Sequence, residues 1–282
     1  MNKPATKEIS VHSLAEFVKH VCDVESDWNG NDWKICWFRG CGTNHSLLPS
    51  QYRPGYKNDV HDEESTFLEF KQQARGFLDR ELNDWEMYFL MQHYGVPTRL
   101  LDWTSNCLVA LFFALLTNEK DGDPCVWMLN PFLFNHHNAP IQEPYIMVPP
   151  NSVNERYSEK GQRQSLHWIN HLHPLRFNQK QDSNGKDRNI ERPIAISPPL
   201  LDRRVVAQSS FFTLHGGLER SIDENCMDCD ESSHVNFIRK FVLSVDREVM
   251  LRQLTCFGIT RQRVYPDLDG LGRELRHRLM DI

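Results

Sequence analysis

The chain has 282 residues, of which 40% are hydrophobic and 11% aromatic, and its formal net charge is −6 with His counted as neutral. This composition allows one large packed domain or two small ones and excludes global disorder. The acidic balance excludes nucleic-acid binding through bulk positive charge, so any such contact needs a local basic patch. The most apolar run, Leu108–Leu116, is too short to cross a membrane and predicts a buried helix instead.

The first zone, from residue 9 to about residue 114, holds most of the predicted elements. Apolar residues at helical spacing between Val11 and Val21 predict a helix, with Ser10 as its N-cap. The segment Trp33–Gly40 is aromatic and β-branched, so it predicts a strand that runs into a turn.

Two more helices are predicted before the apolar run. Glu64–Leu82 places five apolar residues on one face, namely Phe67, Phe70, Ala74, Phe77 and Leu78. Trp85–His93 predicts a second, short helix. In the run itself, Phe112 and Phe113 are expected in the core.

The middle zone, residues 130–193, has weak periodicity and many polar residues, and it predicts a long insertion or loop. The zone contains five His residues, namely His136, His137, His167, His171 and His173. No zincin pattern accompanies these residues, so a solvated loop is favoured over a metal site. Basic residues interleave there with Tyr157, Trp168 and Phe177, a mixture that can also contact single-stranded nucleic acid.

The last zone regains order. Strands are predicted over Val205–His215 and Phe237–Val245, and helices over Asp246–Cys256 and Leu268–Leu279. Strands and helices do not alternate regularly, so the expected class is α+β. We expect one domain over residues 1–282, with a core at 30–129 and 194–275.

The eight Cys are expected to be mostly free thiols in a cytoplasmic protein, because the N-terminus lacks the apolar region of a signal peptide. Cys226 and Cys229 form a CxxC pair, which raises the question of zinc. A structural zinc site needs four ligands, and no second pair is present, so an acidic loop is favoured and no metal is expected.

Three motifs resemble the FRG domain family, which is named after its Phe-Arg-Gly triplet. They are Trp37–Gly40, which contains the triplet Phe38-Arg39-Gly40, the long block Gln92–Thr104, and Ala110–Ala114. Two later pieces agree with the family: Ala207-Gln208 together with Phe212-Thr213, and Tyr265–Leu271. The resemblance spans most of the chain, and the block from Gln92 is its most specific part.

A more distant resemblance is to ADP-ribosyltransferases. That family has a strand that ends in an aromatic-Arg-Gly triplet, then a Ser/Thr-rich strand that leads into an apolar helix, then a later strand with a Glu. Phe38–Gly40 is similar to the first of these elements, and Asp102–Ser105 before the apolar helix is similar to the second. Gln208 stands where that family carries a Glu. The resemblance implies split mixed β-sheets with flanking helices and a long polar insertion, and it implies NAD as the substrate, with no metal.

The resemblance also implies roles for individual residues. Arg39 would clamp the diphosphate, Gly40 would approach the nicotinamide amide, and Thr104 or Ser105 would bond the ribose. His93 is a further candidate for cofactor binding.

Gln208 can orient a hydroxyl but cannot act as a base, so a carboxylate must come from elsewhere. The candidates are Asp102 and Asp267, with Glu86 as a more distant one.

The expected function is therefore transfer of ADP-ribose from NAD to a macromolecule, with RNA favoured over protein or DNA. Such an activity is typical of a toxin or effector in bacterial anti-phage defence, with a cognate antitoxin or chaperone as a further partner. The alternative is a non-catalytic module that binds a nucleotide or a protein in the same cleft. A hydrolase centred on His93 and Asp102 lacks a recognisable nucleophile elbow.

Plainer interpretations compete for several of these residues. Arg39 can be a structural arginine paired with Asp102, and His93 can be a core histidine. Asp267 lies where a helix cap is expected. Alternation along the strand separates Arg99 from Asp102 and Thr104, so these two rank above Arg99 as site residues.

Overall fold

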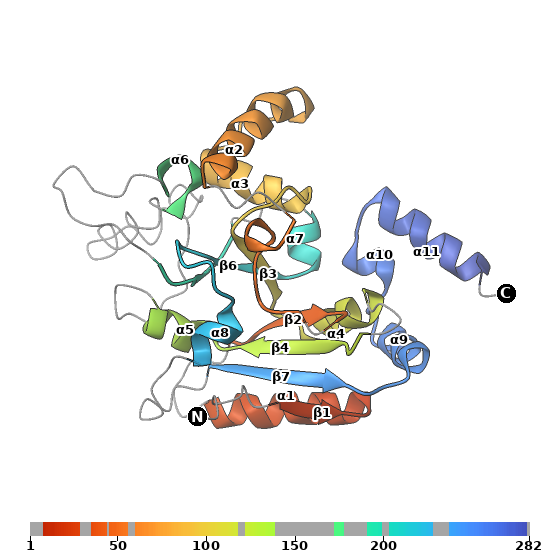
Figure 1. The fold of residues 1–282 in the computed structure, drawn as a ribbon. Helices are drawn as coiled ribbons and strands as arrows, with labels where there is room; N and C mark the ends of the chain where they lie inside the picture. Colours follow the sequence, from red (N-terminus) through yellow and green to blue (C-terminus); the bar gives the residue numbers. More distant parts are fainter. Residues whose placement is uncertain are drawn as a thin grey trace, which may run out of the picture.

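The computed structural model describes residues 8–28, 35–43, 45–55, 60–117, 122–138, 172–177, 191–198, 203–227 and 237–280. Strands from this part of the chain form one mixed seven-stranded sheet in the order β1-β7-β4-β2-β3-β6-β5 (Figure 1). The strands are β1 (Glu8–Val11), β2 (Trp37–Cys41), β3 (Leu100–Thr104), β4 (Cys125–Leu129), β5 (Ile194–Ile196), β6 (Ser210–Leu214) and β7 (Ile238–Leu243). A mixed sheet flanked by helices agrees with the class expected from the sequence.

The two central strands of the sheet, β2 and β3, share very little pairing. Strands β2 and β4 pair over five residues, and so do β3 and β6, whereas β2 and β3 pair only through Phe38 and Thr104. Of the strand pairs in the described residues, only β1 with β7 is parallel. The expected division into separate sheets is therefore incomplete, because one residue pair keeps the two halves joined.

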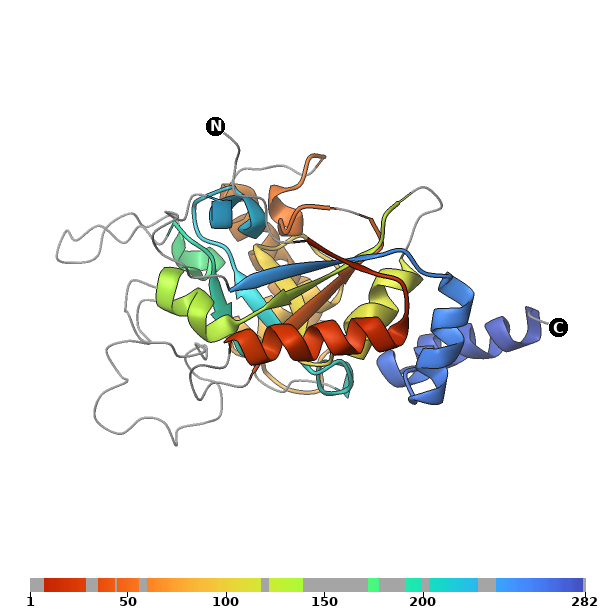
Figure 2. The same cartoon turned by 90° about the horizontal axis from the view of Figure 1, so that it is seen from below.

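Successive side chains of β2 and β4 point to opposite faces of the sheet, and each face packs in its own hydrophobic core. Phe38, Val126 and Met128 point to the face covered by α1 (Leu14–Trp28), α4 (Cys107–Leu116) and α9 (Arg247–Cys256). Trp37 and Trp127 belong to the core on the opposite face, which α5 (Pro131–Asn138) and α8 (Ile222–Met227) help to cover. Figure 2 shows α1 and α4 lying along the sheet.

A third core lies beside β3, β5 and β6. It joins them to α2 (Val60–Ala74) and α3 (Asp84–His93), which lie at the top of Figure 1, away from α1. The remaining elements are two 3-10 turns (Ser50–Tyr52 and Arg75–Phe77), α6 (Pro174–Phe177), α7 (Arg203–Ala207), α10 (Arg261–Val264) and α11 (Leu268–Met280). None of the helices that the structure describes has the length and apolarity of a membrane span.

Most predicted elements are confirmed, with local corrections. Ser10 lies inside β1, and Ser13 caps the first helix instead, since its hydroxyl accepts from the Glu16 amide at 3.2 Å. The helix predicted to reach residue 82 ends at Ala74, and Phe77 is 89% exposed because it follows in a 3-10 turn. Of the two phenylalanines predicted in the core, Phe112 is buried, and Phe113 is partly buried.

The strand predicted over residues 205–215 is wrong in its first half. Residues 203–207 form α7, and β6 begins only at Ser210. Between them Ser209 has a φ of 49°, and its amide donates to the Val206 carbonyl at 3.1 Å. This tight turn separates the β-branched pair at residues 205 and 206 from the strand that follows, and a pattern of apolar residues cannot reveal it.

The predicted insertion begins with ordered structure. Residues 131–138 form α5, which begins after Asn130, whose side chain accepts from the amides of Phe132 and Leu133. Buried Asn135 holds the edge strand β5 by bonding both the amide and the carbonyl of Ala195, at 2.7 and 2.9 Å. His167, His171 and the basic residues of this zone other than Arg176 and Arg192 lie outside the described residues, as does Cys229.

Gly40 allows α4 to approach β2 directly. A Cβ built on Gly40 would lie 1.8 Å from the Ala110 carbonyl oxygen and 2.6 Å from the Ala114 nitrogen. Both are backbone atoms of a helix packed in the core, so a rotamer change cannot relieve the clash. Close packing of α4 against β2 is therefore sufficient reason for glycine at this position.

We predict that Gly40→Ala destabilises the protein by about 3 kcal/mol or more, because the core must move to admit the methyl group. Urea denaturation followed by circular dichroism measures the loss. Gly76→Ala is the matched control, since a Cβ there meets nothing within 4 Å, and it should unfold close to the wild type. Equal stability of the two variants would contradict the packing argument.

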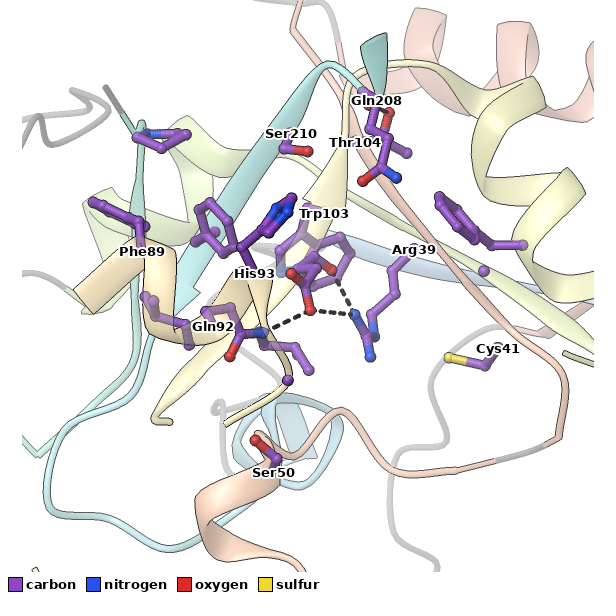
Figure 3. Close-up of a pocket in the computed structure, with 18 of the residues that line it drawn as sticks. Arg39, Cys41, Ser50, Phe89, Gln92, His93, Trp103, Thr104, Gln208 and Ser210 are labelled. Atoms are coloured by element: carbon purple, nitrogen blue, oxygen red, sulfur yellow. Dashed lines mark hydrogen bonds and ion pairs between the residues drawn. The ribbon is translucent and has the colours of Figure 1, made fainter. Parts of the chain in front are cut away.

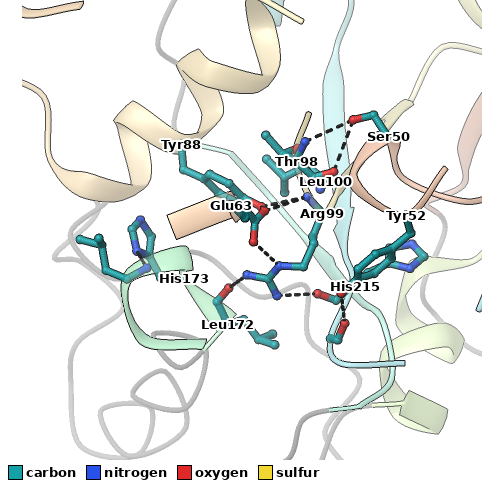
Figure 4. A network of polar contacts seen from close by, with 12 residues as sticks. Ser50, Tyr52, Glu63, Tyr88, Thr98, Arg99, Leu100, Leu172, His173 and His215 are labelled. Carbon is teal, nitrogen blue, oxygen red and sulfur yellow. Dashed lines mark hydrogen bonds and ion pairs between the residues drawn. The ribbon is translucent and has the colours of Figure 1, made fainter. Parts of the chain in front are cut away.

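Arg99 lies at the centre of a buried polar network (Figure 4). Its Nε lies 2.6 Å from Glu63 Oε2, and the side chains of both residues are at most 1% exposed. Its Nη1 donates to the His215 carbonyl at 2.9 Å, and its Nη2 donates to the Leu172 carbonyl. The Tyr88 hydroxyl donates to Glu63 at 2.5 Å. This guanidinium therefore ties α2 to the chain before β3 and after β6, and it is structural.

Arg99→Leu is predicted to lower the free energy of unfolding by about 3–5 kcal/mol, because Glu63 would remain buried without its cation. Guanidinium denaturation checks this. Arg75→Leu removes one partner of the exposed pair with Glu81 and should change stability by less than about 1 kcal/mol. A loss at Arg99 no larger than that at Arg75 would show that Glu63 finds another partner or takes up a proton.

Candidate functional site

A cavity of about 520 Å³ opens where β2 and β3 diverge (Figure 3). Beyond the Phe38–Thr104 pair the two strands are no longer bonded to each other, and side chains from both strands line the space between them. Helices α3 and α4, the segment after β2, and β6 with the segment before it contribute further walls. The volume is that of a small-molecule or cofactor pocket.

Arg39 bridges the gap between the two strands. Its Nη1 donates to the backbone carbonyl of Asp102 at 2.7 Å and lies 3.7 Å from the carboxylate oxygen Oδ2 of the same residue. The Arg39 side chain is 19% exposed, so part of the guanidinium still faces the cavity. The structural pairing expected for Arg39 and Asp102 is thus present, and it lies inside the cavity.

Asp102 supplies a carboxylate at this position. Its side chain is 55% exposed, and Oδ2 accepts a hydrogen bond from the Gln92 amide at 2.9 Å. Gln92 is itself oriented, because its carbonyl accepts from the Thr98 hydroxyl at 2.5 Å. The carboxylate is therefore held between an amide and a guanidinium with one side open to solvent.

Gln92 is a site residue to which the sequence reasoning gave no role. It lies in the last turn of α3, ten positions before Asp102, and Thr98 lies between them. All three residues belong to the Gln92–Thr104 block, so the motif contains them. The motif does not show that they meet, because the turn at Gly95, with a φ of 76°, brings Gln92 back toward β3.

Thr104 and Gln208 line the cavity, and both have structural partners. The Thr104 hydroxyl donates to the Gln208 carbonyl at 2.6 Å and accepts from the Asn106 amide at 3.0 Å. The Gln208 side chain donates to the Val264 carbonyl at 3.1 Å. These contacts fasten the segment before β6 and the end of α10 to the centre of the sheet.

The other predicted site residues divide into those at the cavity and those outside it. His93 lines the cavity, and its ring meets the edge of the Tyr94 ring at 5.0 Å. Gly40 lines it too, although the position of its absent side chain faces α4. Ser105 is not in the wall, and its amide donates to the Ser209 carbonyl at 3.1 Å.

Asp267 and Glu86 do not reach the cavity wall. Asp267 accepts from the Gly270 amide at 2.7 Å and caps α11, as the plainer interpretation expected. Glu86 is 7% exposed and completes the capping box of α3 with Asn83. Of the three carboxylates considered, only Asp102 lies beside Arg39.

The cavity also holds cationic and apolar groups that the sequence reasoning did not select. Arg53 and His45 come from the segment after β2, so a second guanidinium lines the same cavity as that of Arg39. Phe89 and Phe113 add ring surfaces from α3 and α4. The combination of two guanidinium groups, a carboxylate and aromatic rings suits a ligand with anionic groups and a planar ring.

His136 and His137 lie in α5, away from the cavity wall. His137 faces the Phe237 ring at 5.7 Å, and burial lowers its pKa, assisted by Arg192. His173 packs among Phe67, Trp85 and Tyr88, and burial lowers its pKa to about 4. Within the described part of the chain, no three His, Cys, Asp or Glu side chains gather as a metal-binding group.

Comparison with protein families matches residues 34–123 to the model of the FRG domain. This range contains β2, α2, α3, β3 and α4, and it therefore includes Arg39, Gln92 and Asp102. Comparison with curated proteins and comparison with solved structures gave no match. The cavity is thus lined in large part by residues of the segment that matches the FRG domain model.

Proposed function

We propose that the cavity between β2 and β3 binds NAD and that the protein transfers ADP-ribose from it to a macromolecule. The observation that carries the proposal is the placement of Arg39 and Asp102 side by side in a pocket of cofactor size, with Nη1 3.7 Å from Oδ2. A phosphate clamp and a carboxylate are the two groups that this reaction needs most.

In the proposed reaction the bond between nicotinamide and the ribose breaks, and nicotinamide leaves with the bonding electrons. The positive charge that develops on the ribose is stabilised by the Asp102 carboxylate. The acceptor forms the new bond to the ribose carbon, and its proton passes to Asp102, which is partly exposed and can release it to water. Gln92 fixes the carboxylate in place at 2.9 Å.

Arg39 and Arg53 are the proposed diphosphate partners. Arg39 lines the same cavity as Phe89 and Phe113, whose rings supply surfaces for the nicotinamide or adenine. The Asp102 carboxylate partly neutralises Arg39. A diphosphate therefore binds in competition with Asp102, and its arrival frees the carboxylate to face the ribose.

The acceptor that we propose to test first is RNA, with protein and DNA as comparison arms. Folded wild-type protein incubated with labelled NAD should release nicotinamide and label one of these acceptors. Asp102→Asn keeps the shape of the side chain and removes its charge, so turnover should fall by about 100-fold or more. Asp23→Asn, in the exposed pair with Lys19, is the matched control and should leave turnover unchanged.

No nicotinamide release and no labelled acceptor, from wild-type protein with an intact fold, would overturn the transfer reaction. An equal loss in Asp102→Asn and Asp23→Asn would remove Asp102 from the mechanism.

One observation favours a second function, a recognition module that binds a nucleotide without turnover. The Thr104 hydroxyl and the Gln208 amide already donate hydrogen bonds to main-chain carbonyls. These bonds give both residues a structural role that needs no catalysis. Calorimetry with NAD and ADP-ribose distinguishes the two functions. Arg39→Lys should weaken binding by about 10-fold in either case, because Lys cannot form the bidentate contact. Tight binding of ADP-ribose without nicotinamide release would establish the module.

A further inference from the structure

Two free cysteines lie opposite each other on β2, which lines the cavity, and on its neighbour β4. Cys41 is the last residue of β2, Cys125 is the first residue of β4, and the two are directly opposite partners in the antiparallel ladder. Opposite residues in such a ladder have Cα atoms about 4.5–5.5 Å apart. Disulfides span Cα distances of about 4.4–6.8 Å, so the backbone is already placed for a bond between these residues.

The two thiols differ in access. Cys41 lines the cavity and retains 9% exposure, whereas Cys125 is fully buried. A small reagent that enters the cavity therefore reaches the Cys41 sulfur first. Because both residues stand at the ends of their strands, a side-chain rotation that brings the sulfurs together needs little change in the rest of the sheet.

The charges around the pair favour the same order of reaction. A hydrogen bond from Cys125 lowers the pKa of Cys41 most, and the positive charges of Arg39 and His45 add to this effect against the opposing effect of burial. Donating that hydrogen bond raises the pKa of Cys125, and burial adds to this effect. The thiolate form is thus favoured at Cys41, and the protonated form is favoured at Cys125.

We propose that Cys41 and Cys125 form a redox-active dithiol that takes a low-molecular-weight disulfide as its oxidant and closes to a cross-strand disulfide. The Cys41 thiolate attacks one sulfur of the oxidant, which forms a mixed disulfide and releases one small thiolate. Cys125 then passes its proton to the released small thiolate and attacks the Cys41 sulfur, which breaks the mixed disulfide. The second small thiolate leaves and takes a proton from water, which balances the proton that Cys41 lost to water when it ionised. Two protein thiols are oxidised to one disulfide, and one small disulfide is reduced to two thiols.

Loss of the Cys41 thiolate in the first step assists the second step. In the reduced pair the proton of Cys125 is held by Cys41. Once Cys41 is bonded to the oxidant it carries no charge, so this restraint on Cys125 disappears. The other cysteines for which a pKa shift is resolved behave differently, because burial raises the pKa of Cys36 to about 12 and that of Cys107 to about 11.

The test exposes the reduced full-length protein to glutathione disulfide, blocks the remaining thiols by alkylation, and maps the cysteines by mass spectrometry. The expected product is a Cys41–Cys125 disulfide that forms before Cys36 or Cys107 reacts. Cys125→Ser should stop at a mixed disulfide on Cys41, because no second sulfur is present. Cys41→Ser should leave Cys125 unmodified, because Cys125 is fully buried.

Wild-type protein that keeps both thiols while the exposed Cys22 and Cys256 become mixed disulfides would overturn the proposal. So would a mixed disulfide on Cys125 in the Cys41→Ser variant, since it would show that Cys125 is reached without Cys41. Circular dichroism of each variant ensures that the fold is intact. No NAD is present, so the outcome is independent of the proposed transfer reaction.

The pH dependence of alkylation provides a second test of the same pair. Thiolate, not thiol, reacts with iodoacetamide, so the rate at Cys41 rises with pH and levels off above its pKa. Because that pKa is lowered, we predict that the rise occurs at lower pH than for Cys107. Cys125→Ala removes the hydrogen-bond donor and should move the rise to higher pH, whereas Cys125→Ser keeps a donor and should restore it. Identical profiles for all three proteins would contradict the assignment.

Discussion

The single residue pair that joins β2 to β3 determines where this protein can place polar groups. A continuous ladder would consume the backbone donors and acceptors of both strands, and it would leave no space between them. Here the ladder stops after Phe38 and Thr104, and the Arg39 side chain bonds the Asp102 carbonyl across the gap instead. On the other side of β2, Gly40 lets α4 pack directly against the strand. The cavity therefore follows from the backbone arrangement of β2 and β3.

Two arginines illustrate how burial separates structure from function. Arg99 is fully buried, is matched by Glu63, and has carbonyl partners on two further segments. Arg39 is paired with the Asp102 carboxylate, which is itself 55% exposed, and its guanidinium still borders an open volume. An anion that enters the cavity can exchange with Asp102 at small cost, because a pair this exposed to water is weak. Displacing Glu63 from Arg99 would leave a buried charge and break the fold.

The sequence predicts those parts of the fold that depend on local periodicity. The helices at Trp85–His93, Leu108–Leu116 and Asp246–Cys256 were placed within a residue or two because their apolar faces and caps are local. The strand over residues 205–215 was misplaced because the Ser209 turn depends on its backbone φ. Asp102 was selected from the motif, whereas Gln92 received no role, since its hydrogen bond to Asp102 depends on a turn that reverses the chain. Pairing across strands, as for Cys41 with Cys125, requires the register of the sheet and is absent from any single segment.

Arg39 finally connects the two proposals through charge. It faces Asp102 on β3, and it also stabilises the negative charge of Cys41 two residues along its own strand. In the reduced protein one guanidinium thus serves two acidic groups, and a ligand anion competes with both. Closing of the dithiol would remove one competitor, because a disulfide sulfur carries no charge. Coulomb attraction between Arg39 and an incoming phosphate would then be less compensated, so oxidation at the end of β2 would strengthen anion binding in the cavity without moving any residue of β3.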